Sequence, residues 1–444
     1  MIQKGNHMSD YKLSEIAQNE MKDFALYTVE SRAIPNMIDG LKPVQRFYLY
    51  SSIVNTPKDY KKVSAVSGVV SDYGYNHGEA SAASAGQLMA ATWNNNICLI
   101  EGRGSFGTRQ VQQAGAARYV YTRLHSNFSK YIKDISLSPV HEDPEHTPPA
   151  FYIPVIPLVL ANGTRGIATG FATNILPRSE KAIIAACKEY VTKGKISKRL
   201  QVAFPDFNGT TIYDETSNRH MCLGTFDRPT KTKLIINEIP YGFDREGYIK
   251  ILDKLEEDDV IMGYDDQCSS DGFRFEIKLK QAVANKLNTD EKIIKQFKLE
   301  KAFAENLTVI DANGKLKEYD DERELIKDFC NYRMGILQKR IDGEIEKFSE
   351  EIRWLNVKAE FVKGVLEDQI TFKGKTKAQV EKLILQHTSA LPTDTDRLLR
   401  MNLLTLTKDM IKDLMDKIKE TKDNLKFWNT TTTKDQFISD LKLG

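Results

Sequence analysis

Long hydrophobic runs are absent from this 444-residue sequence. No stretch approaches the roughly 18 uninterrupted apolar residues of a membrane span. The polar start, MIQKGNHMSDYKLSE, lacks the apolar core of a signal peptide. We therefore expect a cytoplasmic protein with no membrane partner. The chain is also too long for one typical domain, so two to four folded units are expected.

Cysteine is scarce, and its spacing is unpaired. The five positions are Cys98, Cys187, Cys222, Cys268 and Cys330. Such scatter argues against a disulfide framework and against a zinc module, so we expect buried thiols.

A strong net charge is missing as well. Lys and Arg total 63 against 61 for Asp and Glu, which leaves +2. Composition alone therefore does not indicate a nucleic-acid binder, and any DNA-binding surface must be local.

Several familiar catalytic motifs are also absent. The glycine-rich ANGTRGIATG lacks the Gly-Lys-Ser/Thr of an ATP-binding loop, and no G-x-S-x-G is found. The acidic run 256–259 is more typical of a solvated face than of a magnesium site. His141 and His146 lie in a Pro-rich turn that we interpret as a connecting loop. We expect no metal centre on this chain.

What is present divides the chain into three stretches. Helical amphipathicity marks SEIAQNEMKDFALYTVESRAIP and PVQRFYLYSSIVN in the first stretch, from about Ser14 to Tyr131. A Pro-rich connection leads into a second stretch, where TKLIINEIP, FRFEIKLK and NLTVID alternate like strands. These patterns predict a helical unit followed by an α/β unit.

The third stretch, from about Asp321, has heptad spacing. One seam comprises Ile341, Ile345, Phe348, Ile352, Leu355, Ala359, Val362 and Leu366, and a second comprises Ile411, Leu414, Ile418, Thr421, Leu425 and Trp428. Two such helices are expected to pack antiparallel as one arm, with the intervening segment as a small knob. A helical bundle packed on the body is the alternative on period alone.

GAARYVYTRL contains two tyrosines, and either phenol could act as a nucleophile or only pack in a core. A phenol is roughly one part in a thousand ionised at neutral pH, which costs about 4 kcal/mol for direct attack, so it needs activation. Arg118, directly before Tyr119, supplies a permanent cation. In a strand Tyr119 and Tyr121 would share a face, and in a helix they would diverge. From these residues alone, a packing role stays open for both.

Six ordered motifs resemble the breakage-reunion part of type IIA DNA topoisomerases. They are SRAIPNMIDGLKPVQRF, YGYNHGEASAASAGQLM, EGRGSFGTR, AARYVYTRL, PVIPLVLANGTRGIATGFATNILPRS and LLRMNLLTLTKDMIKDL. The resemblance runs from about Glu30 to Asn429. It is greatest to the medium subunit of the multi-subunit enzyme of tailed bacteriophages, with gyrase A and eukaryotic topoisomerase II as more distant relatives.

The resemblance implies roles for individual residues. It makes Tyr119 the nucleophile that forms a 5′-phosphotyrosyl link, with Arg118 beside it and Tyr121 in a packing role. It places Arg32, Lys42, Arg46 and His77 at the cleaved strand and its phosphates. It makes Ile175 a wedge inserted between base steps, an apolar device that bends DNA. Taken alone, His77 and Ile175 would more often be structural.

The implied fold is multidomain α+β. It comprises an N-terminal arm (1–29), a winged-helix domain with the catalytic tyrosine (30–145), an α/β tower (146–320), an outgoing coiled-coil helix (321–368), a helical exit-gate knob (369–407) and a returning helix with its tail (408–444).

The resemblance also implies partners. These are double-stranded DNA, a second copy of the chain meeting it at the knob, and a subunit that carries Toprim and ATPase domains. Mg²⁺ and ATP would be bound by that subunit, and the isolated chain would relax little DNA. No DNA-wrapping domain follows the arm, so relaxation or decatenation is expected.

Two departures from the family pattern affect drug and phosphate binding. Relatives often have a second histidine where this chain has Asn76. Gyrase-type enzymes bridge quinolones through a serine and an acidic residue at the positions of Ala80 and Ser84, so weak quinolone sensitivity is expected.

Two rival classes remain. A non-catalytic DNA clamp would not need Arg118 before Tyr119, and a covalent adduct discriminates the two. A tyrosine recombinase or type IB enzyme would link to a 3′ phosphate, but its Arg-His-x-x-Arg cluster is not found.

Overall fold

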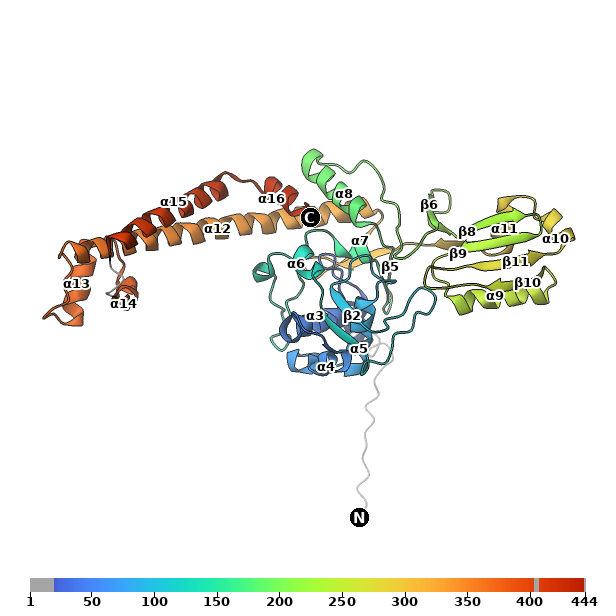
Figure 1. The fold of residues 1–444 in the computed structure, drawn as a ribbon, viewed down its shortest axis with the longest axis horizontal. Helices are drawn as coiled ribbons and strands as arrows, with labels where there is room; N and C mark the ends of the chain where they lie inside the picture. The colour runs from blue at the N-terminus through green and yellow to red at the C-terminus, as the bar shows by residue number, and fades with distance from the viewer. Residues whose placement is uncertain (1–19, 403–406, 443–444) are drawn as a thin grey trace, which may run out of the picture. The chain divides into compact units, whose positions relative to one another are not determined.

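The computed structural model describes residues 20–402 and 407–442. They divide into two compact units, one reaching Arg333 and taking up the chain again from Asp440, the other holding Met334–Ser439. Figure 1 labels many of the helices and strands and colours the chain from the N-terminus to the C-terminus. Every helix in the described ranges is too short or too polar to cross a membrane.

The first unit opens with helices packed on a small sheet. The helices are α2 (Glu20–Thr28), the π-helical turn η1 (Val29–Ala33), α3 (Pro43–Asn55), α4 (Val63–Gly68), the 3-10 turn η2 (Val70–Tyr73) and α5 (Glu79–Ala90). Strands β1 (Lys61–Lys62), β2 (Ile100–Arg103) and β3 (Tyr121–Leu124) pair antiparallel in the order β1-β3-β2. The helix predicted in PVQRFYLYSSIVN is confirmed. The helix expected over 14–35 is confirmed from Glu20, and its earlier residues lie outside the described part.

Local sequence explains how α3 is fixed. Pro43 stands in its first turn, where the missing N–H has no helical partner to lose. Tyr48 is buried, and its hydroxyl lies 2.6 Å from Thr122 Oγ1 on β3. On α5, a Cβ at Gly86 would lie 2.2 Å from the Tyr48 ring. The close approach of α3 and α5 therefore requires glycine at this position.

A Pro-rich connection and two hairpins follow. The helices are α6 (Asn127–Tyr131), the 3-10 turn η3 (Ile135–Leu137), α7 (Leu158–Asn162) and α8 (Glu180–Lys193), and the hairpins are β4 (Thr164–Ile167) with β5 (Ala172–Ile175) and β13 (Leu307–Ile310) with β14 (Leu316–Tyr319). Segments before and after 145/146 share one compact unit. Val155 N, for example, donates to Tyr131 O over 2.8 Å. The predicted boundary at 145/146 stays a prediction.

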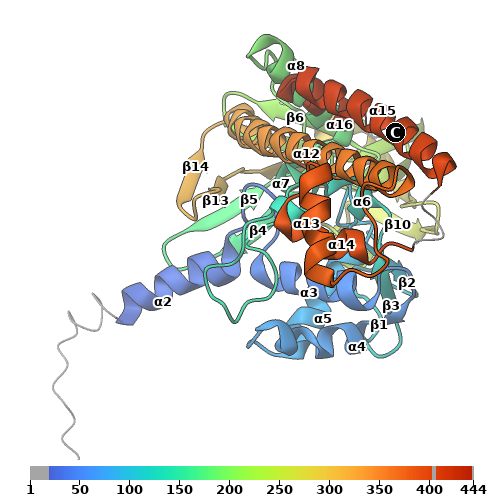
Figure 2. The ribbon, with the colours of Figure 1, turned by 90° about the vertical axis from the view of Figure 1, so that its left-hand side faces the viewer.

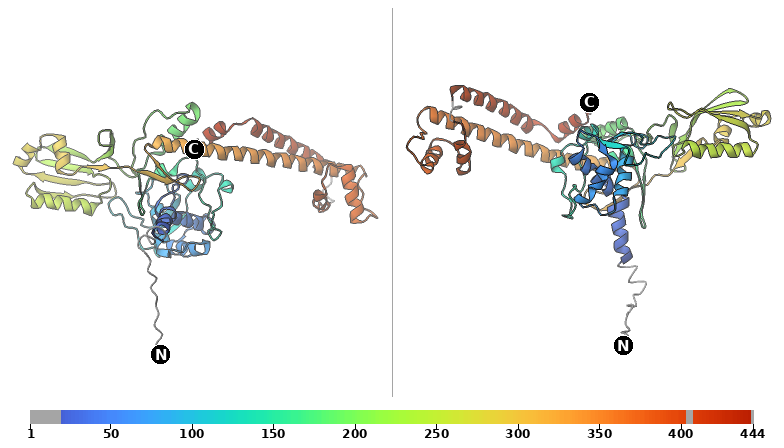
Figure 3. Two further views of the ribbon diagram at one scale, coloured as in Figure 1. Left: turned by 180° about the vertical axis from the view of Figure 1, so that it is seen from behind. Right: turned by 60° about the horizontal axis from the view of Figure 1, so that its bottom comes forward.

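An antiparallel sheet with three helices forms a lobe of the first unit. Its strands β8 (Thr225–Thr230), β9 (Lys233–Glu238), β10 (Ile261–Asp266) and β11 (Phe275–Leu279) lie in the order β10-β11-β9-β8. The helices α9 (Arg245–Glu257), α10 (Gln281–Lys286) and α11 (Asp290–Gln296) enclose a core with them (Figure 3). Residues 225–297 are called the sheet lobe below.

A second sheet lies next to it in the chain. Strands β6 (Thr210–Asp214), β7 (Arg219–Leu223) and β12 (Glu300–Phe303) lie in the order β12-β7-β6. The strands predicted in TKLIINEIP, FRFEIKLK and NLTVID are confirmed as β9, β11 and β13.

Four of the five cysteines are buried, as expected. Cys268 differs, because it is partly exposed in the turn between β10 and β11. There its Sγ accepts a hydrogen bond from Arg274 N over 3.3 Å.

The second unit consists of helices. Its elements are α12 (Glu322–Leu366), which enters the unit at Met334, α13 (Lys377–His387), the 3-10 turn η4 (Pro392–Asp394), α14 (Thr395–Leu399), α15 (Lys408–Thr430) and α16 (Thr433–Asp440). Figure 2 shows α15 running beside α12. Leu414 and Ile418 on α15 share a core with Leu355 and Val362 on α12. These four seam positions are buried as the heptads predict.

At its far end the α12 seam departs from the heptad pattern. Leu366 is 39% exposed, whereas Val357 and Phe361, outside the pattern, are buried. Both join a core with Val380 and Ile384 of α13. A heptad pattern describes one partner helix, and here the segment of α13 and α14 covers a further face of α12. The expectation for Leu366 was wrong for this reason.

Candidate active site

Tyr119 lies in a turn just before β3, held in place by main-chain bonds. Tyr119 N donates to Ala116 O over 2.8 Å. Two N–H groups at the start of α4 bind the same turn, since Val63 N donates to Val120 O over 3.0 Å and Ser64 N donates to Ala117 O. Val120 is buried and anchors the turn. Residues 115–120 are called the tyrosine turn below.

The two side chains singled out in this turn lie together at the surface. Tyr119 is 70% exposed. The guanidinium carbon of Arg118, also exposed, lies 5.1 Å from the centre of the Tyr119 ring. Tyr121 is the first residue of β3 and is half as exposed. Because Tyr119 belongs to a turn, neither the strand nor the helix alternative applies to the pair.

Arg123, at the other end of β3, is engaged elsewhere. Its Nε lies 2.9 Å from Glu101 Oε2, and the Tyr60 hydroxyl donates to the same carboxylate over 2.5 Å. These hydrogen bonds lower the pKa of Glu101. Arg118 and Arg123 therefore differ in role, because only Arg118 faces a tyrosine of the turn.

His77 and Arg32 form a second exposed group. The Tyr27 hydroxyl is hydrogen-bonded to His77 Nε2, and the Tyr75 ring lies edge-on to His77 at 5.4 Å. Partial burial, and then the charge of Arg32, lower the pKa of His77. The lowered pKa favours the uncharged imidazole at neutral pH, beside the positively charged Arg32.

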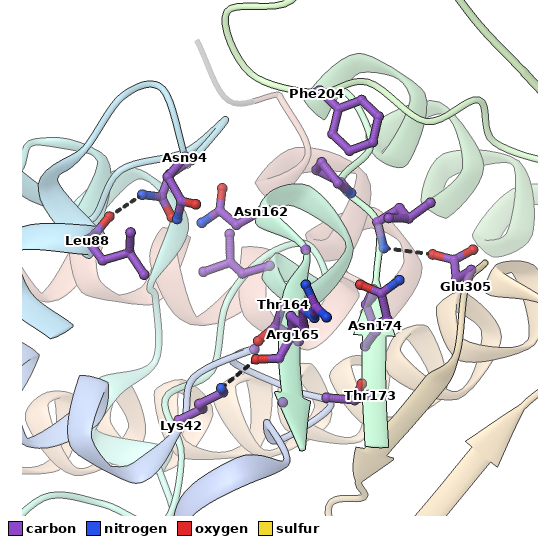
Figure 4. A pocket seen from close by; sticks show the side chains of 18 of the residues that line it. Lys42, Leu88, Asn94, Asn162, Thr164, Arg165, Thr173, Asn174, Phe204 and Glu305 are labelled. Carbon is purple, nitrogen blue, oxygen red and sulfur yellow. Dashed lines mark hydrogen bonds between the residues drawn. The ribbon is translucent and has the colours of Figure 1, made fainter. Parts of the chain in front are cut away.

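Lys42 reaches a hollow of about 1030 Å³ in the first unit. Its Nζ donates to Arg165 O over 2.7 Å, and burial lowers its pKa. Figure 4 shows Lys42 pointing toward Arg165 on β4, with Asn174 on the neighbouring β5. Ile175 lines the same hollow.

Arg46 differs from the other predicted cations because it is buried. Its Nε and Nη2 lie 2.8 and 3.0 Å from the two oxygens of Asp39, and Nη2 also donates to Leu41 O. Asp39 in turn accepts from Tyr152 N. The guanidinium is thus occupied by protein groups rather than presented to solvent.

Ile175 is buried too, with 2% of its side chain exposed. The next residue, Leu176, donates its N–H to Glu305 over 2.8 Å, and Glu305 is paired with the buried Arg178. The large apolar side chains exposed on the same hairpin are Ile167 and Phe171. Ile175 is therefore packed in this structure, and its role as a wedge stays a prediction.

Asn76 lies just before α5 and is exposed. Ala80 and Ser84, on α5 itself, are exposed as well. Ser84 Oγ donates back to Ala80 O over 2.9 Å. The two positions therefore share one solvent-facing side of α5.

The acidic run 256–259 is exposed, as expected. His141 and His146 bond to each other over 3.2 Å in the connecting loop. In residues 20–402 and 407–442, no three His, Cys, Asp or Glu side chains are placed to hold a metal ion.

Arg109 is a residue that the sequence analysis missed. It is 5% exposed and paired with Glu238 of β9. Its only sequence signal is its place in EGRGSFGTR, between β2 and Tyr119. A loop arginine without visible periodicity gives no indication of burial.

A family model that describes the A subunit of DNA gyrase/topoisomerase IV matches residues 32–442. The chain therefore belongs to this family of type II DNA topoisomerases. Over 442 residues it is 41% identical to the DNA topoisomerase medium subunit of Enterobacteria phage T4, covering 98% of this chain and 99% of that phage protein. The resemblance inferred from the six motifs is confirmed.

More distant relatives are longer. DNA topoisomerase 2 of Plasmodium falciparum is 28% identical over 98% of this chain, which spans 34% of that enzyme. A crystal structure of the Plasmodium falciparum topoisomerase II DNA-binding, cleavage and re-ligation domain superposes with a TM-score of 0.84 at 27% identity. The superposition covers 97% of this chain and 63% of the chain in that crystal structure. The mixed α/β fold is shared with that domain.

Proposed function

We propose that this chain cleaves and religates DNA through Tyr119, within an ATP-dependent type II topoisomerase. The observation that carries the proposal is the exposed Tyr119 phenol with the Arg118 guanidinium over its ring. A phenol at the surface is accessible to a phosphodiester. The adjacent cation is placed to stabilise the charge that develops on the phosphoryl oxygen.

The reaction balances as a transesterification. The Tyr119 oxygen forms a bond to phosphorus as the bond to the 3′ oxygen breaks, and the phenolic proton ends on the released 3′ hydroxyl. Reversal restores both groups, so resealing needs no external energy. Two copies, each cutting one strand, let a second duplex pass and so relax or decatenate DNA.

Arg32, Lys42 and His77 are proposed to hold the DNA near the cut. Arg32 offers a permanent charge, whereas the lowered pKa of His77 makes it a neutral hydrogen-bonding partner at neutral pH. For Arg46 we propose an indirect role: its ion pair with Asp39 fixes the start of α3 next to Lys42. Phosphates would then meet Lys42 rather than Arg46.

The wedge role of Ile175 remains part of the proposal, with a condition. Because Ile175 is buried here, intercalation requires that DNA binding uncover it. Unstacking a base step costs a few kcal/mol, which the wrapped duplex must offset together with the lost packing.

The division into parts follows the same proposal. Residues 30–145 are assigned as a winged-helix domain, in agreement with α3, α4, α5 and the small sheet, and 146–320 as the tower. Residues 321–368 and 408–444 are assigned as a coiled-coil arm, and 369–407 as the exit-gate knob. A second copy would meet the first at the knob around a two-fold axis.

A partner subunit is proposed to supply the Toprim and ATPase domains. Mg²⁺ and ATP are assigned to the partner because the family resemblance implies that its Toprim and ATPase domains bind them, and every residue role proposed here concerns this chain's own tyrosine and cations.

The test mixes the chain with its Toprim-bearing partner, Mg²⁺ and end-labelled supercoiled DNA, and stops the reaction with detergent. Wild type is expected to give protein linked to the 5′ end, and Tyr119→Phe is expected to give none. Tyr121→Phe is the matched control and should retain the adduct. An adduct that survives in Tyr119→Phe would move the role to Tyr121, and no adduct in wild type would leave a non-catalytic clamp.

A further inference from the structure

The chain between β2 and the tyrosine turn forms a closed loop. Gly115 N donates to Ser105 O over 2.9 Å, so the loop leaves and returns at one point. Gln87 on α5 donates to Gly115 O over 2.6 Å and holds that point against the helix. Residues 105–115 are called the coupling loop below, and its base is the start of the tyrosine turn.

The far end of the coupling loop is fixed by Arg109. Its Nη1 lies 3.1 Å from Glu238 Oε1 on β9, and Nη2 donates to Ile239 O over 3.3 Å. Nη1 also donates to Asp206 O. Three aromatic rings surround the guanidinium carbon at 5.1–5.3 Å, those of Phe207, Tyr241 and Phe273.

Gln110 adds a second attachment to the sheet lobe. Its Nε2 donates to Ser269 O and Gly272 O over 2.5 and 3.0 Å, in the turn between β10 and β11. Its carbonyl accepts from Arg245 N at the start of α9 over 3.2 Å. Main-chain groups of two lobe elements therefore bind this one residue.

The hydrogen bonds of Arg109 and Gln110 fix an orientation as well as a contact. A buried ion pair is a weak source of stability, because apolar side chains of similar volume often serve as well. A guanidinium with fixed partners does, however, set direction, since its planar fork accepts few orientations. The bonds of Arg109 and Gln110 thus set where the coupling loop lies relative to the sheet lobe.

We propose that Arg109, supported by Gln110, is a positioning residue for cleavage that links the sheet lobe to Tyr119. The loop is attached to the lobe at one end and to α5 and the tyrosine turn at the other. A change in lobe position, such as one imposed by DNA bound along it, is passed to the turn that holds the nucleophile. This inference rests on the proposed role of Tyr119.

The test measures single-turnover cleavage by the full chain with its partner subunit, Mg²⁺ and a 5′-labelled duplex. The variants are Arg109→Ala, Arg109→Lys, which keeps the charge but loses the fork, and Gln110→Ala. Misplacing a reacting group by about 1 Å costs up to about 100-fold in rate. We expect both Arg109 variants to lower the cleavage rate constant about 10- to 100-fold and Gln110→Ala to lower it less.

Rate and amplitude separate positioning from folding. A misplaced tyrosine lowers the rate constant, with the final amount of adduct and the DNA affinity retained. A partly unfolded variant lowers the amplitude and leaves the rate constant unchanged, and that result for Arg109→Lys and Gln110→Ala would overturn the inference. Arg245→Ala is the matched control, since its side chain pairs with Asp266 in the same lobe, and the main-chain N–H by which it binds Gln110 is kept by the substitution.

Failure of this inference is distinguishable from failure of the proposed function. If wild type forms no adduct at Tyr119, the proposed function itself is wrong. If wild type cleaves and all three variants keep its rate constant, only the role of Arg109 and Gln110 is wrong.

Discussion

The tyrosine turn and the β4–β5 hairpin are both expected to touch DNA, yet they present their key residues in opposite ways. Tyr119 is 70% exposed, whereas Ile175 is 2% exposed. The proposed nucleophile is exposed, and the proposed wedge is packed within the protein. The two proposed roles therefore differ in what they require, because cleavage needs no change to expose Tyr119, whereas bending needs one to uncover Ile175.

The largest expected effect tests the exposed side of this comparison. Arg118→Ala should lower cleavage about 10²- to 10³-fold, the loss typical of removing one charge-stabilising donor. Because Arg118 is exposed, the free energy of unfolding should change by less than about 0.5 kcal/mol. Single-turnover cleavage and urea denaturation measure the two quantities. Arg103→Ala, an exposed arginine opposite Tyr121, is the control and should cleave normally.

The second prediction tests the buried side. Ile175→Ala should lower the free energy of unfolding by about 2–5 kcal/mol, the range for truncating a buried aliphatic side chain. Ile167→Ala, on the exposed part of the same hairpin, should leave stability unchanged. Urea unfolding of both variants provides the measurement, and equal stability losses would contradict the contrast.

The third prediction concerns the carboxylate that holds the end of the hairpin. Burial alone would raise the pKa of Glu305, but the hydrogen bonds and charge of Arg178, then His220 and Leu176 N–H, lower it to about 2. Because the pKa of Glu305 is lower in the folded protein than its ordinary value of 4.5, the ionised carboxylate stabilises the fold at any pH above that value. This stabilisation is lost as the pH falls from about 4.5 through about 2. The difference between the two pKa values corresponds to about 3 kcal/mol of folding stability.

Glu305→Gln should remove this contribution at neutral pH and flatten the stability curve between about pH 5 and 2. Other carboxyl groups titrate in the same window, so the difference between wild type and variant is the quantity to measure by urea unfolding. Parallel curves for the two proteins would show that Glu305 contributes nothing there.

The sequence predicted helices and strands better than it predicted which side chains are exposed. PVQRFYLYSSIVN and the α15 seam were predictable because periodicity reports directly on helices with one buried face. Burial of Arg46 was not, since its partner Asp39 precedes α3 and no pattern shows that the two meet. Leu366 was misplaced because a heptad pattern names only one packing partner.

The burial of Arg109 in the coupling loop was not predictable either. Arg109 lies in the motif EGRGSFGTR, but its partners Glu238 and Asp206 are about a hundred residues away along the chain. Pairings at such distance depend on tertiary contacts, which a local pattern does not report. The family resemblance directed attention to Tyr119 and Arg118, and the structure adds how the turn that carries them is attached.

The smallest expected effect concerns α5, which adjoins the base of the tyrosine turn through Gln87. Ala80 and Ser84 occupy the positions where the resemblance places the quinolone-bridging serine and acidic residue, so we predict weak drug trapping of cleaved DNA that Ser84→Ala leaves unchanged. Combining Ala80→Ser with Ser84→Glu should increase it, because the two positions share one exposed side of the helix. Detergent-trapped adduct against drug concentration measures both. Potent trapping in wild type that disappears in Ser84→Ala would mean that Ser84 itself serves as the bridge.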